Sequence, residues 1–276
     1  MNGLAALGSE LRRELGSRSL EYARRRGLAP VLSRGDPPVV CFKSEGESHG
    51  NFLPESWRRI AANPAWRKRL SKTHTSARSA FASYDGEGLR ELDSCNSSDA
   101  LLMNVFCYPR VLADGRVSAM LGIEDEASEP EFGFRARVPL ARRGADATEV
   151  DMRLGNLLVE AKLTEADFQV ARDDRQVQRY RDLEVVFECD ELPRIAERYR
   201  GYQLIRNVLA AQALECSFCV LLDARRPDLR EQWYAVMRCV RPPELRVRCK
   251  VLTWQELKGV LPRKLQSFLK EKYGIE

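Results

Sequence analysis

The sequence predicts an α/β protein, with a mixed α+β arrangement in which helices cover one β-sheet. Three strand-like runs follow one another between residues 132 and 162, and helical patterns come after them. A strand–helix–strand unit then closes the pattern between residues 218 and 253. Strands in this succession, separated by helices, form a mixed sheet with helices packed on its faces.

The composition is that of one large or two small folded domains. Of the 276 residues, 44% are hydrophobic and 31% are charged, which is the balance of a globular protein rather than a disordered chain. The net charge is +5, and Arg supplies 36 of the 45 basic residues. Guanidinium groups bind phosphates and carboxylates bidentately, so this content permits an anionic partner. Codon usage in a genome rich in G and C explains it equally well.

Membrane and secreted classes are not expected. The sequence has no run of 18 apolar residues, which a transmembrane helix needs. Its first residues lack the basic leader and apolar run of a secretory signal. The eight cysteines lie in mostly apolar surroundings, and a chain of this length does not need disulfides. We therefore expect a cytoplasmic protein with reduced thiols and no membrane partner.

Residues 1–92 predict a helical N-terminal region that ends in a linker. Residues 3–26 have the pattern of an amphipathic helix, and residues 76–92 are small and polar. Between them, a second helical region has an apolar face made by Trp57, Ile60, Trp66 and Leu70. Basic side chains, Arg69 among them, are expected on its remaining surface. Such basic helices can contact phosphates, but a charged run on a helix is usually its solvated face.

Residues 93–255 carry the alternating elements, and residues 256–276 form a helical extension. The first expected element is a helix over residues 98–106, with Asn96, Ser97 or Ser98 as its cap. The remaining elements follow in chain order. We expect strands over residues 132–138, 148–154 and 157–162, helices over residues 165–187 and 192–214, a strand over 218–222, a helix over 229–240 and a last strand over 245–253.

The two strands between residues 148 and 162 have the most informative pattern. Gly155-Asn156 between them is a two-residue hairpin turn. Counting outward from this turn places Asp151 directly opposite Glu160. Side chains alternate between the two faces of a strand pair. One face is therefore wholly apolar and must pack against a helix; it consists of Val150, Met152, Leu154, Leu157, Val159 and Ala161.

The other face of this hairpin places two carboxylates side by side. Directly opposite residues have β-carbons roughly 5 Å apart, where like charges destabilise unless a cation lies between them. Two hard oxygen ligands suit Mg²⁺, which takes one or two carboxylates together with substrate phosphates. Lys162 follows Glu160 by two residues and shares its face. The alternative is a solvent-facing strand pair in which Glu149 and Lys162 form an ion pair.

At these residues the sequence resembles the PD-(D/E)XK nuclease superfamily. Its signature is an acid on one strand, then Asp or Glu, any residue and Lys on the next. Asp151 and the run Glu160-Ala161-Lys162 match this signature, whereas Val150 replaces the proline that names it. The resemblance implies a restriction endonuclease-like core of helix, three-stranded meander, helix and strand, to which N-terminal and C-terminal helices are added.

Two further segments are similar to those of bacterial restriction endonucleases of unassigned specificity. The segment NSSDALLMN occupies residues 96–104 before the hairpin, and YQLIRN occupies residues 202–207 after it. The second segment contains Gln203, at the place where many superfamily members have Gln on the helix after the signature lysine. Some members also place an extra acid upstream, where this sequence has Asp99 and Glu131.

The resemblance implies a metal-dependent endonuclease that hydrolyses phosphodiester bonds of DNA. Asp151, Glu160 and the backbone carbonyl of Ala161 would hold Mg²⁺, with Mn²⁺ as a substitute, and Lys162 would orient the attacking water. The other candidate residues are Gln203 for catalysis, Arg206 and Arg153 for contacts with nucleic acid, and Glu149 as an acid that tunes Lys162.

Two alternatives remain open from the sequence. One is a nucleic-acid-binding module on the same fold without catalysis, against which the complete set of Asp, Glu and Lys speaks. The other is an α/β interaction protein without a metal. The choice between DNA and RNA, the strandedness of the substrate and the attack on ends or internal bonds also stay open. Cleavage of both DNA strands needs two active sites and hence a homodimer.

The cysteines and histidines give weaker signals. Cys216 and Cys219 form a C-x-x-C motif, and Cys239 and Cys249 follow, so four thiolates could bind zinc. Buried, unreactive thiols are the favoured interpretation because their surroundings are mostly apolar. The only histidines, His49 and His74, belong to no ligand motif, and we expect both in surface loops.

Overall fold

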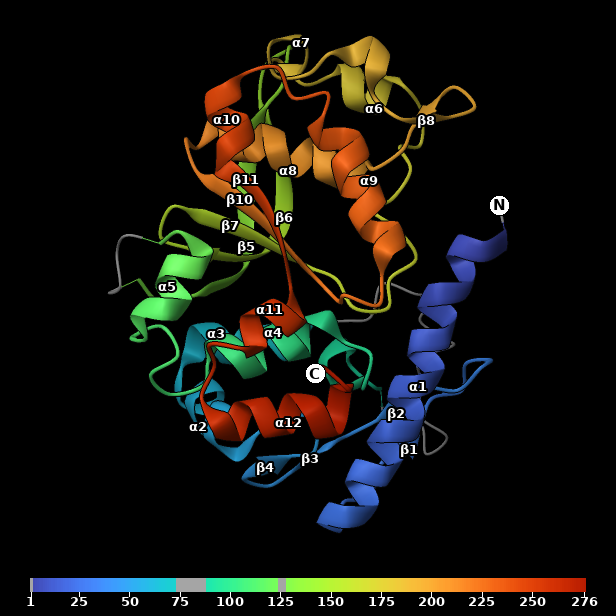
Figure 1. The fold of residues 1–276 in the computed structure, drawn as a ribbon, viewed down its shortest axis with the longest axis vertical. Helices are drawn as coiled ribbons and strands as arrows, with labels where there is room; N and C mark the ends of the chain where they lie inside the picture. The colour runs from blue at the N-terminus through green and yellow to red at the C-terminus, as the bar shows by residue number, and fades with distance from the viewer. Residues whose placement is uncertain (1, 73–87, 124–127) are drawn as a thin grey trace. The chain divides into compact units, whose positions relative to one another are not determined.

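The computed structural model describes residues 2–72, 88–123 and 128–276 (Figure 1). The chain divides into two compact units. Met1–Met120 and Trp254–Glu276 form the first, named here the helical unit, and Leu121–Thr253 form the second, named the sheet unit. The boundaries expected at residues 92/93 and 255/256 stay predictions.

The helical unit is built from the helices that come before and after the sheet unit in the chain. They are α1 (Asn2–Arg26), α2 (Pro54–Ala62), α3 (Pro64–Arg69), the 3₁₀ helix η1 (Glu91–Asp93), α4 (Ser98–Phe106), α11 (Trp254–Lys258) and α12 (Arg263–Tyr273), and α5 (Gly115–Leu121) ends at the boundary. Two short antiparallel strand pairs join them: β1 (Val31–Leu32) with β2 (Val40–Cys41), and β3 (Ser44–Glu45) with β4 (Ser48–His49). The helices α1 and α12 pack against each other (Figure 1).

Two of the expected N-terminal helices form as predicted, and one is divided. The helices α1 and α4 match the predictions, and the hydroxyl of Ser97 caps α4 by accepting from the backbone of Ala100 at 3.1 Å. The second helical region breaks into α2 and α3 because the Asn63 side chain caps a new helix, whose first residue is Pro64. Arg69, expected on the surface, is buried there.

The helix α12 carries a buried lysine in the helical unit. Lys272 is wholly buried, and its ammonium donates a hydrogen bond to the carbonyl of Gly50 at 3.1 Å. Burial lowers the pKa of Lys272 to about 7. Four aromatic rings have their centres within 4.1–5.9 Å of the ammonium: those of Tyr22, Phe42, Phe268 and Tyr273.

The sheet unit has one five-stranded mixed sheet with the order β11-β10-β7-β6-β5. The strands are β5 (Glu131–Pro139), β6 (Ala145–Leu154), β7 (Leu157–Ala161), β10 (Ser217–Leu222) and β11 (Cys249–Thr253). The first three form an antiparallel meander, and β7, β10 and β11 run parallel. The helices α8 (Tyr202–Ala213), α9 (Pro227–Met237) and α10 (Pro243–Arg248) pack against these strands (Figure 1). The predicted α/β class and its meander are confirmed.

The core of this unit lies between the sheet and α8. Apolar side chains of the strands, such as Leu158 and Val220, pack with side chains of the helix, such as Leu204, Ile205 and Val208, and all five are fully buried. Removing this apolar surface from water contributes about 1.5–3 kcal/mol for each side chain. The core therefore fixes α8 on the strands that carry the hairpin residues.

Three expected elements of the sheet unit differ from the structure. Residues 165–187 form only the short helices α6 (Arg175–Gln178) and α7 (Leu183–Val186), and the 3₁₀ helix η2 (Cys189–Glu191) follows. In place of the start of the helix expected over 192–214, β8 (Arg194–Ile195) and β9 (Arg198–Tyr199) form a hairpin. The strand expected over 245–253 begins only at Cys249, because α10 occupies the residues before it.

The loop before α8 fixes the residue at which this helix begins. Gly201 has a φ of +72° immediately before α8, a conformation that ends any preceding helix. The first backbone N–H groups of α8 then bind carbonyls of the loop: Tyr202 donates to Gln169 at 3.0 Å, and Gln203 donates to Phe168 at 2.9 Å. These bonds satisfy N–H groups that a helix start leaves unpaired.

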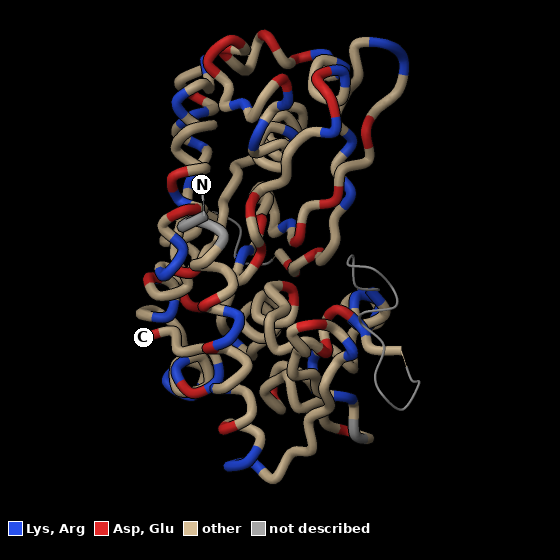
Figure 2. Tube along the Cα trace, turned by 90° about the vertical axis from the view of Figure 1, so that its right-hand side faces the viewer, with Lys and Arg blue, Asp and Glu red and all other residues tan. Residues whose placement is uncertain are grey.

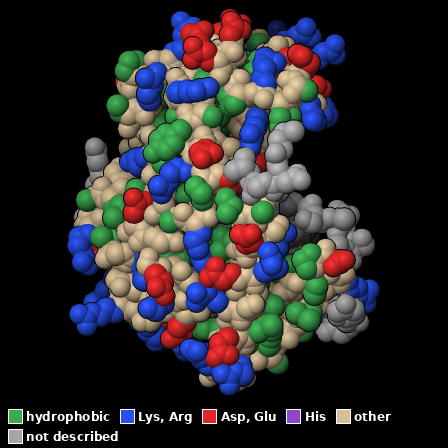
Figure 3. All heavy atoms as spheres, turned by 45° about the vertical axis from the view of Figure 1, so that its right-hand side comes forward, with side chains coloured by type: hydrophobic (Ala, Val, Ile, Leu, Met, Phe, Trp, Pro, Cys, Tyr) green, Lys and Arg blue, Asp and Glu red, His purple; other side chains and the backbone are tan. Residues whose placement is uncertain are grey.

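Charged side chains are distributed over much of the surface. Figure 2 shows basic and acidic positions interspersed along the trace, and the face shown in Figure 3 mixes them with small apolar patches. Among the residues that the structure describes, no helix is long and apolar enough to cross a membrane.

Candidate functional site

The predicted hairpin register is confirmed next to its turn. The pairs Leu154–Leu157, Arg153–Leu158 and Met152–Val159 form as counted from Gly155-Asn156. All six side chains of the predicted apolar face are 1% exposed or less. Alternation along β7 therefore places Leu158 and Glu160 together on the opposite face, which packs against α8.

The paired ladder ends just before Asp151. Its carboxylate, rather than its backbone, bridges to β7, and Oδ2 accepts a hydrogen bond from the N–H of Ala161 at 2.9 Å. The adjacent N–H, that of Lys162, points to the other neighbour and binds the carbonyl of Leu221 at 2.7 Å. The N–H and C=O of one strand residue point the same way. The carbonyl of Ala161 therefore points toward the strand that carries Asp151.

Glu160 is the most fully bound carboxylate of this region. It is 1% exposed. Its Oε1 accepts from Lys162 Nζ at 2.9 Å and from Gln203 Nε2 at 2.5 Å, and its Oε2 accepts from Asn207 Nδ2 at 2.9 Å. Charge-assisted hydrogen bonds of this kind are the strong ones. A buried negative charge is thus held by one cation and two amides.

Asn207 was not predicted from the sequence. It lies four residues after Gln203 on α8, and residues at this spacing share one face of a helix. The pair of amide side chains at positions i and i+4 is the signal that identifies it. Both side chains reach the same carboxylate, that of Glu160, so the helix supplies a two-point contact.

Lys162 is a buried cation among three carboxylates. It is 6% exposed. Burial alone lowers the pKa of Lys162, but the negative charges of Glu160, Glu165 and Asp151 outweigh burial and raise this pKa above its ordinary value. The ammonium is therefore protonated at neutral pH and acts as a hydrogen-bond donor and positive charge.

Glu165 is a second residue that the sequence prediction missed. Its Oε2 accepts from the backbone N–H of Leu163 at 2.6 Å, so the chain turns back immediately after the signature lysine. This turn brings a third acid near Lys162. Sequence alone could not identify this acid, because Glu165 comes close to Lys162 only through the turn that follows the strand.

Two buried amide oxygens in this region have no partner. Gln203 Oε1 and Asn207 Oδ1 are buried and accept no hydrogen bond within the described residues, since both amides turn their N–H groups toward Glu160. Leaving a buried acceptor unsatisfied costs about 1–3 kcal/mol. The site is therefore short of donors or of a cation.

The oxygen atoms present fit a hard divalent cation. Asp151 and Glu160 supply two carboxylates, and Gln203 Oε1 and the carbonyl of Ala161 are further oxygen donors. Within the described ranges, no cluster of three or more His, Cys, Asp or Glu residues could hold a metal ion. Mg²⁺ needs no such cluster, because it binds through one or two carboxylates and takes the remaining ligands from water and phosphate.

The residues predicted to contact nucleic acid lie on α8 and β6. The guanidinium of Arg206 lies over the ring of Tyr202 at 5.3 Å, and its buried Nε has no partner among the described residues. Arg153 lies over the ring of Phe134 at 4.8 Å and donates to the carbonyl of Gly155 at 3.0 Å, at the hairpin turn. Glu149 is half-buried, two residues before Asp151.

The other acids and histidines predicted from the sequence lie outside the group that binds Glu160 in the described part of the chain. Asp99 is buried in the helical unit and binds Arg69 at 3.0 Å and Lys72 at 2.6 Å, which explains why Arg69 leaves the surface. His49, expected in a surface loop, is buried and contacts Asp93 at 3.1 Å. His74 lies outside the described residues, and Glu131 is exposed at the start of β5.

The cysteines of the C-x-x-C motif are buried thiols. Cys216, Cys219 and Cys239 are 2% exposed or less, and Cys249 is half-buried. Burial raises the pKa of Cys219 and of Cys249 to about 12. Thiols with such pKa values are protonated at neutral pH, whereas zinc binds the thiolate.

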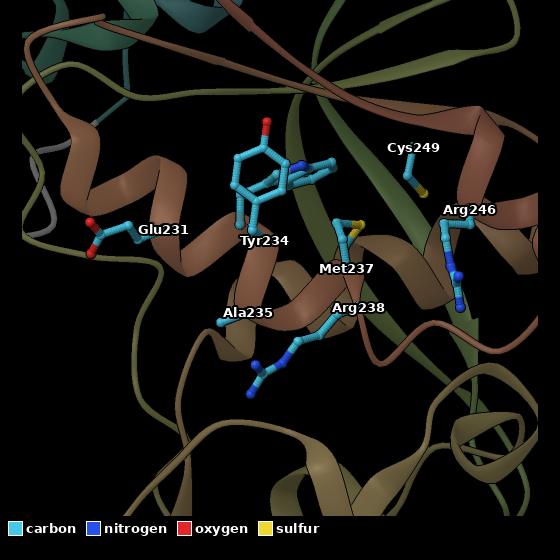
Figure 4. Close-up of a pocket in the computed structure, with 8 residues that line it drawn as sticks. Glu231, Tyr234, Ala235, Met237, Arg238, Arg246 and Cys249 are labelled. Atoms are coloured by element: carbon cyan, nitrogen blue, oxygen red, sulfur yellow. The ribbon is translucent and has the colours of Figure 1, made fainter.

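A separate hollow of about 610 Å³ lies at α9, α10 and β11. Figure 4 shows Tyr234 from α9 and Arg238, the residue after this helix, beside it, with Arg246 from α10 and Cys249 from β11. Arg246 is already bound to the carbonyl of Val240. None of the predicted site residues lines this hollow.

Comparison with protein families gives a match that covers most of the chain. The model of a family described as restriction endonuclease associating with ARP matches residues 30–274. No curated protein and no solved structure matches the chain. The matched range contains the whole hairpin and all of α8.

Proposed function

The chain belongs to the family of restriction endonucleases associating with ARP, and from this premise we propose that it is a metal-dependent endonuclease that hydrolyses phosphodiester bonds of DNA. The match supports the predicted resemblance of the chain to a restriction endonuclease-like family. The observation that carries the proposal is the buried Glu160, held by Lys162, Gln203 and Asn207 beside Asp151.

Three groups of this chain would hold the metal. They are the carboxylates of Asp151 and Glu160 and the backbone carbonyl of Ala161, and the cation would be Mg²⁺ or Mn²⁺. A divalent cation in such a site polarises the scissile phosphate and lowers the pKa of bound water. The unpaired oxygen of Gln203 supports a cation or its water at this place.

The side chains around the carboxylates have distinct tasks in this proposal. Lys162 orients the attacking water and offsets negative charge on the phosphate. Gln203 and Asn207 fix the position of Glu160. Arg206 contacts the neighbouring phosphate.

The remaining assignments belong to the same proposal. Arg153 contacts the DNA backbone near the hairpin turn, and Glu149 tunes the charge around Lys162. The description of the family names ARP as what these endonucleases associate with, and we propose ARP as a partner of this chain.

The test is a nuclease assay with two variants of the site. Wild type, Asp151→Ala and Lys162→Ala are incubated with plasmid, single-stranded DNA and RNA in the presence of Mg²⁺, Mn²⁺ or EDTA. We expect wild type to cleave DNA only with a divalent cation, and both variants to lose cleavage. The control is Glu184→Ala, an exposed acid on α7, which should cleave like wild type.

Two outcomes would contradict the proposal. Cleavage by wild type in EDTA would exclude a metal-dependent reaction. Full cleavage by Asp151→Ala would remove the assigned site from the reaction. A protein that binds DNA without cleaving it under any of these conditions would support the non-catalytic nucleic-acid-binding alternative instead.

A further inference from the structure

The chain directly after the signature lysine, residues 163–168, is named here the lysine segment. It has no helix or strand of its own, so its buried backbone groups need partners outside a regular ladder. Two of its carbonyls, those of Leu163 and Ala166, accept hydrogen bonds from the guanidinium of Arg226, at 3.3 and 3.4 Å. One side chain therefore holds the lysine segment at two points.

Arg226 is itself fixed by a carboxylate. It comes directly before α9 and is fully buried. Its Nε and Nη2 donate to the two oxygens of Asp228 at 2.8 and 2.7 Å, which is the bidentate geometry of strong Arg–carboxylate pairs. Asp228 is 2% exposed. This pair orients the guanidinium, and the remaining N–H groups of Nη1 and Nη2 serve the two carbonyls of the lysine segment.

The far end of the lysine segment returns to the ammonium of Lys162. The ring of Phe168 has its centre 5.5 Å from Lys162 Nζ, which is within the range of a cation–π contact. Phe168 is fully buried, and its N–H donates to Oε1 of Gln232 on α9 at 3.4 Å. The ammonium that donates to Glu160 at 2.9 Å therefore also contacts a ring carried by the lysine segment.

From these contacts we propose that Arg226 is a positioning residue of the nuclease, because it holds the segment that keeps Phe168 against Lys162. The inference rests on the proposed function, in which Lys162 orients the attacking water. Since Arg226 is fully buried, it acts through the lysine segment and not on the substrate. A displacement of about 1 Å at the reacting groups can lower a rate by about 100-fold, even when its cause is remote. Arg226 therefore controls the rate of cleavage rather than the binding of DNA.

A double variant separates this role from a contribution to the fold alone. Arg226→Met by itself should be strongly destabilised, because Asp228 stays buried without its cation. Arg226→Met/Asp228→Leu removes both charges, and apolar replacement of a buried ion pair commonly preserves stability. This variant keeps the fold and lacks both bonds to the lysine segment. The matched control is Arg194→Met/Asp174→Leu, which removes an Arg–Asp pair at 2.9 Å elsewhere in the sheet unit.

Three measurements are made on wild type and both double variants. Plasmid cleavage in Mg²⁺ at increasing protein concentrations, with protein in excess, gives a maximal rate and a half-saturating concentration. Urea denaturation gives the midpoint of unfolding. Hydrogen exchange gives the protection of the backbone N–H groups in the lysine segment and in β7.

We expect Arg226→Met/Asp228→Leu to keep the wild-type urea midpoint and half-saturating concentration, and to lose about 10-fold to 100-fold in maximal rate. Hydrogen exchange should accelerate in the lysine segment and stay unchanged in β7. The control pair should match wild type in all three measurements. A wild-type maximal rate in the double variant of Arg226 would overturn the inference. A raised half-saturating concentration with an unchanged maximal rate would also overturn it, since Arg226 would then serve DNA binding.

Arg226→Lys decides the question if the double variant does not fold. It keeps a cation beside Asp228 but lacks the planar fork of donors. We expect it to fold and to cleave more slowly than wild type at saturating protein. A wild-type rate from this variant would show that the two-point hold on the lysine segment is not needed, and would overturn the inference.

Failure of the proposed function gives a different result. If Asp151→Ala cleaves as fast as wild type, the assigned site is not where the reaction occurs, and the inference about Arg226 falls with it. If Asp151→Ala loses cleavage while the Arg226 variants keep the wild-type rate, only the inference about Arg226 is wrong.

Discussion

The side-chain amide of Asn207 donates a hydrogen bond at 2.9 Å to Oε2 of Glu160, across 47 positions of sequence. With Gln203 on the adjacent turn, it gives one buried carboxylate two donors from a single helix face. The helix α8 therefore does more than cover the sheet. It sets the orientation of the acid that we propose as a metal ligand.

Replacement of Asn207 by Ala should lower the free energy of unfolding by about 1–3 kcal/mol, because a buried carboxylate oxygen loses its donor. Chemical denaturation of wild type and variant measures this difference. Gln212→Ala, at a half-buried position of the same helix, is the control and should change stability by less. Equal stability of Asn207→Ala and wild type would show that the bond adds nothing to the fold.

Glu160→Ala should be more destabilising, by about 3–5 kcal/mol, since the buried ammonium of Lys162 loses the carboxylate that accepts its hydrogen bond at 2.9 Å. Removing both charges in Glu160→Ala/Lys162→Met should recover part of this loss. Urea denaturation of the single and double variants completes the comparison. If the loss of unfolding free energy in the double variant equals the sum of the losses in the two single variants, the two side chains are not coupled.

Divalent cations should stabilise the folded chain through the same carboxylates. A ligand that binds only the folded state raises the melting temperature, and the rise increases with the logarithm of the ligand concentration above the dissociation constant. We expect Mn²⁺ and Mg²⁺ to raise the melting temperature of wild type and of Glu184→Ala, and EDTA to reverse the effect. Asp151→Ala should show no such rise; a rise equal to that of wild type would place the binding elsewhere.

Lys272→Met should stabilise the protein at neutral pH and lose this advantage as the pH rises. Burial lowers the pKa of Lys272 from 10.5 to about 7, so between these values the unfolded chain binds more protons at this residue than the folded chain. The contribution of Lys272 to stability therefore increases with pH in this window, by about 1.4 kcal/mol per pH unit.

The measurement is the difference in unfolding free energy between Lys272→Met and wild type from pH 6 to pH 10.5. It should be largest near or below pH 7 and shrink toward pH 10.5. Lys270→Met changes an exposed lysine of the same helix and should give a small difference at every pH. A pH-independent difference for Lys272→Met would mean that the four rings around the ammonium compensate for its burial.

The hairpin was predictable from sequence because its determinants are local. A Gly-Asn turn and a period of two fix which residues share a face, and the register follows by counting. The contacts of Glu160 with Asn207 were not predictable in this way. They depend on where α8 packs, and this is decided by the core between helix and sheet.

The segment after the hairpin shows why the apolar pattern of residues 165–187 was misleading. Phe168, Ala171, Val177 and Val186 are fully buried, so the pattern reported burial correctly. It did not report a continuous helix, because Gln169 adopts a φ of +63° and its carbonyl binds the start of α8. The tertiary contact decided the backbone conformation at this point, against the periodicity of the side chains.

The loop bonds at the start of α8 have a mechanical consequence. Lys162 begins the segment that ends at Phe168, and the carbonyl of Phe168 holds the backbone of Gln203. The side chains of Lys162 and Gln203 meet again at Glu160. The chain from Lys162 to Phe168, the backbone bond from Gln203 to Phe168 and the two side-chain bonds to Glu160 thus form a closed loop of connections. A ligand that displaces Lys162 from Glu160 Oε1 therefore acts on the same oxygen to which Gln203 donates.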